Sequence, residues 1–99
     1  MSSFQELIQS DKPVLVDFFA EWCAPCKMMA PELKTLVNNI GDKAKVVKID
    51  IDKNEQASRV FKIKSVPTLM IFQKGELKWR QSGYLNATQL ENALKPFMS

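Results

Sequence analysis

The stretch Val14-Leu-Val-Asp-Phe-Phe-Ala-Glu-Trp-Cys-Ala-Pro-Cys26 decides the fold, because an apolar run leads directly to two cysteines. Residues 14–19 are apolar except for one, and include β-branched and aromatic side chains, which is typical of a strand covered on both faces. Over 24–40, apolar residues recur every three or four positions, which predicts a long helix that ends at Gly41. The cysteines therefore fall where a buried strand leads into a helix.

The rest of the chain predicts a mixed sheet with further helices. Runs of β-branched and aromatic residues predict three more strands: 45–50, 68–73 and 76–82. The last two form a hairpin through Lys74-Gly75. Capping residues followed by apolar side chains predict three more helices: 3–10 after Ser3, 55–61 after Asn54, and one after Asn86. A strand, helix and strand over 14–50 make a βαβ unit with parallel pairing, so we expect an α/β fold in one domain, 1–99.

The composition excludes several classes of protein. The chain has 99 residues, of which 45% are hydrophobic and 25% charged, as in an ordinary globular domain. No apolar run approaches the ~18 residues of a membrane span. The first residues do not resemble a secretory signal, so we expect a cytoplasmic protein that does not bind membranes. The net charge of +3 is spread along the chain and does not favour nucleic-acid binding.

The cysteine content narrows the chemistry. The chain has no histidine, which removes Ser-His-Asp and Cys-His catalysis and the commonest metal ligand. A disulfide between Cys23 and Cys26 closes too small a loop to act as a structural crosslink. Zinc would require two chains that share an all-cysteine site, so we expect no metal. A redox-active pair is the preferred interpretation, and a buried pair that only packs is the alternative.

The position of the pair gives its members different expected roles. Unpaired N–H groups and the helix dipole at a helix start favour the thiolate of Cys23, which is the attacking species in disulfide exchange. Pro25 suits the first turn, where an N–H has no helical partner. Cys26 lies one turn further along and is placed to attack a mixed disulfide.

Asp17 is unusual because it interrupts the most apolar strand. Burial there raises the pKa of a carboxyl, which could then accept the proton of the Cys26 thiol, directly or through water. Lys48, central in the neighbouring strand, could partner it. The alternative is an Asp17 side chain that points outward into solvent.

Three motifs carry a resemblance to the thioredoxin family that covers essentially the whole chain: Asp17-Phe-Phe-Ala-Glu-Trp-Cys-Ala-Pro-Cys-Lys27, Val47-Lys-Ile-Asp-Ile-Asp52 and Ser65-Val-Pro-Thr68. The resemblance implies a thioredoxin fold and a thiol–disulfide oxidoreductase that reduces protein disulfides by dithiol–disulfide exchange. It implies no bound cofactor beyond the redox-active disulfide, and recharging by an NADPH-dependent flavoprotein reductase.

The resemblance also assigns residue roles. Cys23 is implied to be an exposed nucleophile and Cys26 the buried resolving thiol, which Asp17, with Lys48 as its neighbour, deprotonates. Pro67 is implied to be cis, although base rates for X–Pro bonds favour trans. Ala24 and Pro25 are implied to tune the redox potential. A shallow groove for an extended, oxidised protein substrate is implied at six residues: Trp22, Pro25, Val66, Pro67, Gly83 and Tyr84.

Three features depart from the family pattern. Ala24 replaces the usual Gly, Phe19 replaces a usual Trp, and the usual first edge strand is expected to be absent. We therefore expect four strands in the order 45–50, 14–19, 68–73, 76–82, with only the first two parallel. The open edge carries three lysines, Lys43, Lys45 and Lys48, so like-charged copies repel and we expect a monomer.

Two other functions remain possible at this point. A thioredoxin fold could serve as a binding or scaffold subunit in which the two cysteines are incidental. An oxidase or isomerase of an exported compartment is the other alternative, and the lack of a signal and of a histidine between the cysteines weighs against it.

Overall fold

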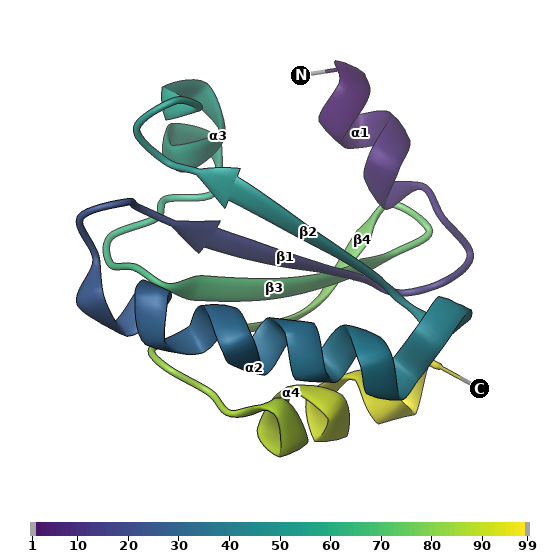
Figure 1. The fold of residues 1–99 in the computed structure, drawn as a ribbon. Coiled ribbons are helices and arrows are strands. Elements are labelled where there is room, and N and C mark those ends of the chain that lie inside the picture. The colour runs from purple at the N-terminus through teal and green to yellow at the C-terminus, as the bar shows by residue number, and fades with distance from the viewer. Residues whose placement is uncertain (1, 99) are drawn as a thin grey trace.

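A computed structural model describes residues 2–98 and confirms the expected four-stranded mixed sheet of an α/β fold (Figure 1). Its strands have the predicted bounds: β1 (Val14–Phe19), β2 (Lys45–Asp50), β3 (Thr68–Gln73) and β4 (Glu76–Ser82). Their order is β2-β1-β3-β4. β1 and β2 are parallel, whereas β3 is antiparallel to β1 and β4 is antiparallel to β3, as expected.

Helices cover both faces of the sheet. The α-helices are α1 (Ser2–Ile8), α2 (Ala24–Ile40), α3 (Glu55–Val60) and α4 (Ala87–Leu94), and two 3₁₀ turns are η1 (Gly41–Lys43) and η2 (Lys95–Phe97). α2 and α4 lie on one face, and α1 and α3 lie on the other (Figure 1). Among residues 2–98, no helix is long and apolar enough to cross a membrane.

Strand β1 contributes to two hydrophobic cores because alternate side chains of a strand point to opposite faces. Leu15 packs with residues of α2 and α4. Val14, Val16 and Phe18 pack with residues of α1 and α3. This explains the nearly continuous apolar run, and it turns Asp17, two residues after Leu15, toward the face that α2 covers.

The ends of the short helices differ from the predictions. α1 begins at Ser2, so the predicted cap at Ser3 is wrong, and it ends at Ile8 rather than at residue 10. It ends there because the β3–β4 turn binds this segment: Gly75 N–H donates to Ile8 O and Lys74 N–H donates to Ser10 O, both at 2.9 Å. These bonds draw the two carbonyls away from helical geometry.

The predicted caps of the other two short helices have different outcomes. Asn86 caps α4 as predicted, since its side chain accepts the Gln89 N–H at 2.8 Å. Asn54 precedes α3, which ends at Val60 rather than at residue 61, but its side chain does not cap that helix. Instead Asn54 Nδ2 donates to Asp50 O at 3.0 Å, which ties α3 to the end of β2.

Candidate active site

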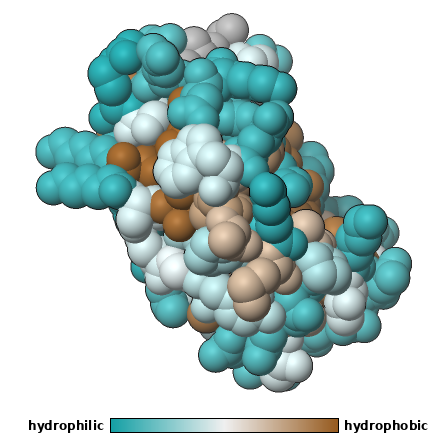
Figure 2. Space-filling model, turned by 60° about the vertical axis from the view of Figure 1, so that its left-hand side comes forward, coloured by the Kyte–Doolittle hydropathy of each residue, from teal (hydrophilic) through white to brown (hydrophobic). Residues whose placement is uncertain are grey.

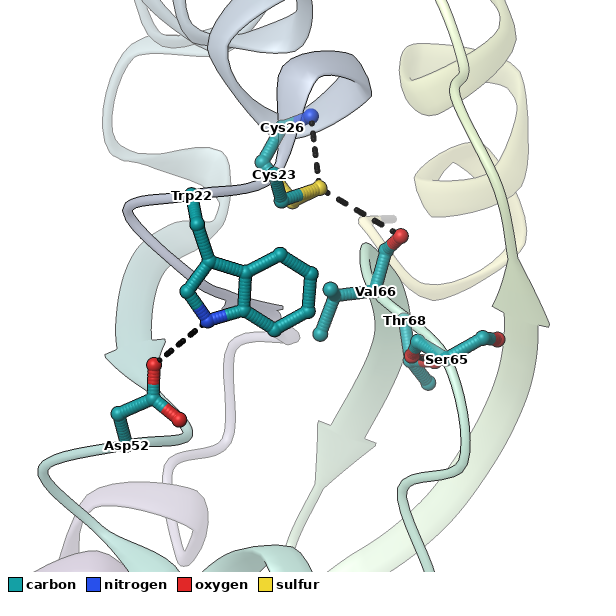
Figure 3. Close-up of a disulfide and its surroundings, with 7 residues drawn as sticks. All are labelled: Trp22, Cys23, Cys26, Asp52, Ser65, Val66 and Thr68. Carbon is teal, nitrogen blue, oxygen red and sulfur yellow. Dashed lines mark hydrogen bonds between the residues drawn. A yellow bond between two sulfur atoms is a disulfide. The ribbon is translucent and has the colours of Figure 1, made fainter.

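The two cysteines form a disulfide at the start of α2 (Figure 3). Cys23 is the N-cap residue, with extended backbone angles, and its Sγ accepts the Cys26 N–H at 3.2 Å. This N–H is one of those that a helix start leaves without a partner. A donor aimed at sulfur stabilises the negative charge of a thiolate, so the local geometry favours ionisation of Cys23 once the disulfide is reduced.

The loop before β3 faces the disulfide. Cys23 Sγ lies 3.5 Å from Val66 O, a contact that becomes a hydrogen bond when the sulfur carries a proton in the dithiol state. The Val66–Pro67 peptide bond is cis, which confirms the expectation. Pro67 O accepts the Gly83 N–H at 2.8 Å, so the segment after β4 lies beside this loop. Backbone from two distant parts of the chain therefore borders the cysteines.

The expected contrast in exposure between the cysteines is wrong. Cys23 is 4% exposed and Cys26 is 5% exposed, because Phe19, Ile51 and Val66 pack against the pair. The two sulfurs differ in surroundings instead. Cys23 caps the helix and touches Val66 O, whereas Cys26 lines a pocket on the side of α2 that faces the sheet.

Asp17 is buried, so the alternative of an outward-pointing side chain is wrong. It is 1% exposed, and neither carboxyl oxygen has a hydrogen-bond partner within residues 2–98. Burial raises the pKa of the Asp17 carboxyl to about 6, an effect that the positive charge of Lys48 partly offsets. A carboxyl with this pKa exchanges protons near neutral pH.

Lys48 is the register partner of Asp17 in the β1–β2 ladder, but it forms no ion pair with it. Its Nζ lies 4.6 Å from the centre of the Phe19 ring, in a cation–π contact. Lys48 and Phe19 line the same pocket as Cys26, with a volume of about 240 Å³. This pocket connects the second cysteine with the lysine next to Asp17, and it is large enough to hold water.

The residues expected to contact substrate gather at one end of the molecule. The Trp22 ring lies beside the disulfide, with Val66 opposite it (Figure 3), and the residue is 69% exposed. Gly83 and Tyr84 are exposed, whereas Pro67, which is bonded to Gly83 through its carbonyl, is buried. Figure 2 shows this end, where apolar side chains gather at the centre of the face and hydrophilic ones surround them. Ala24 and Pro25 are exposed in the first turn of α2.

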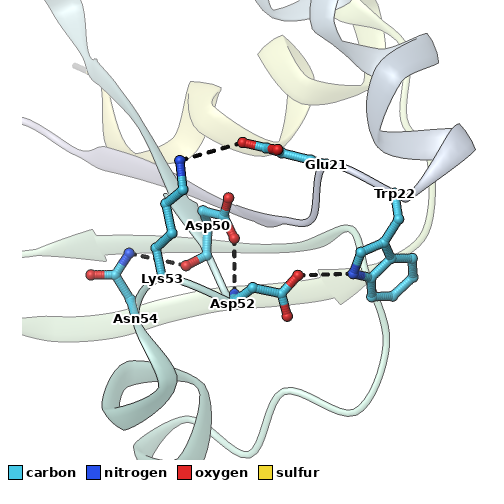
Figure 4. Close-up of polar contacts among 6 residues, drawn as sticks. All are labelled: Glu21, Trp22, Asp50, Asp52, Lys53 and Asn54. Atoms are coloured by element: carbon cyan, nitrogen blue, oxygen red, sulfur yellow. Dashed lines mark hydrogen bonds and ion pairs between the residues drawn. The ribbon is translucent and has the colours of Figure 1, made fainter.

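An acidic cluster that the sequence reasoning missed holds the tryptophan (Figure 4). Trp22 Nε1 donates to Asp52 Oδ2 at 2.8 Å. Buried Asp50 in turn fixes this loop, since its Oδ1 accepts the Asp52 N–H at 2.8 Å. Nearby, Lys53 pairs with Glu21 at 3.4 Å. The sequence does contain a signal for this cluster. Strands β1 and β2 are parallel, so they end at the same sheet edge, and the residues that follow them meet there.

The redox chemistry of the site rests on the Cys23–Cys26 disulfide. Among residues 2–98, no group of three or more His, Cys, Asp or Glu side chains is arranged to hold a metal ion. The arrangement of a capped sulfur, a second sulfur behind it and a buried acid with a raised pKa suits the breaking and forming of disulfide bonds by proton-coupled exchange.

Comparison with known proteins agrees with this chemistry. The sequence model of the family described as Thioredoxin matches residues 1–96. The chain is 45% identical over 93 residues to the thioredoxin of Alicyclobacillus acidocaldarius subsp. acidocaldarius, an alignment that covers 94% of this chain and 89% of that protein.

Solved structures give the same result. Oxidized mitochondrial thioredoxin 3 from Saccharomyces cerevisiae superposes with a TM-score of 0.86 at 33% identity, covering 96% of this chain and 88% of that one. Fasciola hepatica thioredoxin superposes with a TM-score of 0.87 at 31% identity, covering 97% and 92%. Sequence and backbone thus match along nearly the whole chain, and since the cysteine pair is also bonded at the start of α2, the chain belongs to the thioredoxin family of thiol–disulfide oxidoreductases.

Proposed function

We propose that Cys23 is the nucleophile and Cys26 the resolving thiol in the reduction of protein disulfides. The Cys23 thiolate attacks one sulfur of the substrate disulfide and releases the other as a thiolate, leaving a mixed disulfide. The Cys26 thiolate then attacks Cys23 Sγ, which forms the Cys23–Cys26 disulfide and releases the substrate as a dithiol. The observation that carries this assignment is the hydrogen bond from the Cys26 N–H to Cys23 Sγ at the helix start.

Asp17 takes the proton that Cys26 must lose before it attacks. A pKa of about 6 leaves the Asp17 carboxyl mostly ionised at neutral pH and still able to hold a proton. The pocket lined by Cys26 and Lys48 offers space for water beside the thiol and beside the register partner of Asp17. Lys48 favours the ionised carboxylate through its charge.

The substrate lies extended across the surface between Trp22 and the Val66–Pro67 loop. The Asp52 hydrogen bond fixes the Trp22 ring, which then offers a flat apolar surface beside Cys23. Gly83 and Tyr84 are exposed next to the Val66–Pro67 loop and border the other side of the surface. Ala24 and Pro25, between the cysteines, tune the redox potential, because the residues of the first helical turn alter the relative stability of thiolate and disulfide.

The redox partner is an NADPH-dependent thioredoxin reductase, and the chain itself binds no cofactor. It acts as a single domain, 1–99, in the cytoplasm, where a supply of reductant keeps protein thiols reduced. The alternative role as a scaffold subunit is not favoured, because the two cysteines are bonded at the start of α2, where Cys23 Sγ accepts a helix N–H and the Val66 carbonyl faces it.

A coupled assay tests this assignment. With a flavoprotein thioredoxin reductase and oxidised insulin, we expect this chain to drive the oxidation of NADPH. The loss of absorbance at the NADPH band measures this oxidation. Omitting the chain or the insulin should remove the signal. Insulin reduction by dithiothreitol but not by the reductase would show that another electron donor supplies the chain.

The open edge of β2 predicts a monomer at micromolar concentration. Lys43 and Lys45 are exposed at the start of this edge, so two copies pairing there would place like charges together. Sedimentation equilibrium at low and high salt should give the mass of one chain. A dimer that Lys45→Glu does not alter would show that charge does not guard the edge.

A further inference from the structure

The outer side of β2 is a feature that the redox chemistry does not use. β2 ends the sheet order, so within residues 2–98 no strand pairs with that side. The N–H groups of Lys45 and Ile51 both donate at 2.9 Å to carbonyls on the β1 side. Alternate residues of a parallel strand turn their backbone groups to the same side, so Val46 and Lys48 present N–H and C=O to the open edge.

Hollows lie on both faces of the sheet along this edge. One, of about 470 Å³, lies between α2 and β2, with Leu33, Val37 and Val46 as its apolar lining. The other, of about 370 Å³, lies between β2, α1 and α3, and includes Ile49 and Lys53. Since side chains of a strand alternate between faces, a strand added outside β2 would place them in the two hollows in turn.

The side chains at the start of the β2 edge and in the hollow under α2 carry positive charge. Lys34 and Lys48 line the hollow under α2, and no acidic side chain lines it. Lys43 and Lys45 add two more cations at the start of β2. Two neighbouring acidic side chains are each paired with a basic one: Asp42 lies 4.0 Å from Lys12, and Glu55 lies 4.0 Å from Arg59.

We propose that the β2 edge, together with the hollow under α2, binds an extended acidic segment of a partner protein as a fifth strand. Backbone hydrogen bonds join the segment to Val46 and Lys48, and an apolar side chain enters the hollow beside Val37. Acidic side chains alternate with the apolar ones and so point to the opposite face of the sheet, where they pair with Lys45, and Lys43 adds positive charge nearby. The same lysines that oppose a second copy of the chain select this partner, and the site works independently of the redox state of the cysteines.

A designed peptide tests the proposal on the full chain. The probe is a short fluorescein-labelled peptide in which Val and Glu alternate, without cysteine, titrated up to about 1 mM. We expect a rise in anisotropy that weakens with salt. In ¹⁵N–¹H spectra, the amide shifts should centre on Val46 and Lys48 and leave Cys23 unchanged. A peptide in which Val and Lys alternate should not bind.

Two controls separate strand addition from general attraction. Lys45→Glu should weaken binding at least about threefold, whereas Lys95→Glu, the same change away from the edge, should not alter it. A version of the probe with methylated backbone nitrogens cannot donate ladder hydrogen bonds and should not bind. Four results would each overturn the proposal: no binding, equal binding of the methylated probe, amide shifts centred on Cys23, or a dimer of the chain occupying the edge.

Discussion

Cys23→Ser should reduce insulin no faster than dithiothreitol alone, whereas Cys26→Ser should accumulate a covalent complex with its substrate. The reason is the position of each sulfur. Cys23 Sγ accepts the Cys26 N–H at 3.2 Å, so this atom is the stabilised thiolate that starts the exchange. Without the sulfur of residue 26, no thiol of the chain can release the substrate from Cys23, because the chain has only two cysteines.

Mass spectrometry under non-reducing conditions measures the complex directly. Each single variant is mixed with an oxidised protein substrate, and the double variant Cys23→Ser/Cys26→Ser is the control that should form no complex. Insulin turbidity with dithiothreitol gives the corresponding rates. A stable complex with Cys23→Ser instead of Cys26→Ser would reverse the assignment of nucleophile and resolving thiol.

Asp17→Ala should raise the free energy of unfolding at neutral pH by about 1–3 kcal/mol, although it removes a side chain from the core. The Asp17 carboxylate has no hydrogen-bond partner within residues 2–98, so burying its charge costs free energy that alanine does not incur. Chemical denaturation of both proteins at several pH values measures the difference.

The pH dependence follows from the sign of the shift. The folded-state pKa of Asp17, about 6, lies above its ordinary value of 3.8, so the native state holds the proton more tightly than the unfolded state. Its contribution to stability is therefore full below pH 3.8 and is lost as the pH rises through about 6. The free energy of unfolding falls by about 3 kcal/mol over this pH range, and Asp17→Ala should not show this fall.

The same substitution should slow the resolving step. Removing the proton acceptor should lower the rate at which Cys26 attacks the mixed disulfide near pH 7, on the order of 100-fold. The difference in rate between the two proteins should shrink at high pH, where the Cys26 thiol ionises without a neighbouring proton acceptor. Stopped-flow reduction across pH measures this. A destabilised Asp17→Ala protein with an unchanged rate would mean that the carboxyl is only structural.

Local patterns predicted the elements of the fold because each has a signal within its own sequence. The nearly continuous apolar runs of 14–19 and 68–73 are enough to define strands, and the sequence after Asn86 contains both partners of its cap. The end of α1 could not be predicted in this way. Ile8 O bonds to Gly75, a residue of a distant turn, and no local pattern contains that contact.

The site shows the same division between local and long-range information. The placement of Cys23 at a helix start follows from its neighbours in sequence. The low exposure of Cys23 does not follow from its neighbours in sequence, because Ile51 and Val66 pack against it from separate loops. The Trp22–Asp52 hydrogen bond likewise depends on β1 and β2 being adjacent and parallel, and the cis bond before Pro67 was expected from the family resemblance alone.

The central place of β1 in the sheet affects how the chain folds as it is synthesised. Val14 pairs with Lys45 on one side and with Phe72 on the other, so both partners of β1 leave the ribosome long after it does. During that interval an apolar strand has neither neighbour, which is the condition that favours aggregation. Asp17 is ionised in the unfolded chain at neutral pH, because its ordinary pKa is 3.8, and its charge interrupts the apolar run. The carboxylate that destabilises the folded protein thus acts as a gatekeeper in the nascent chain.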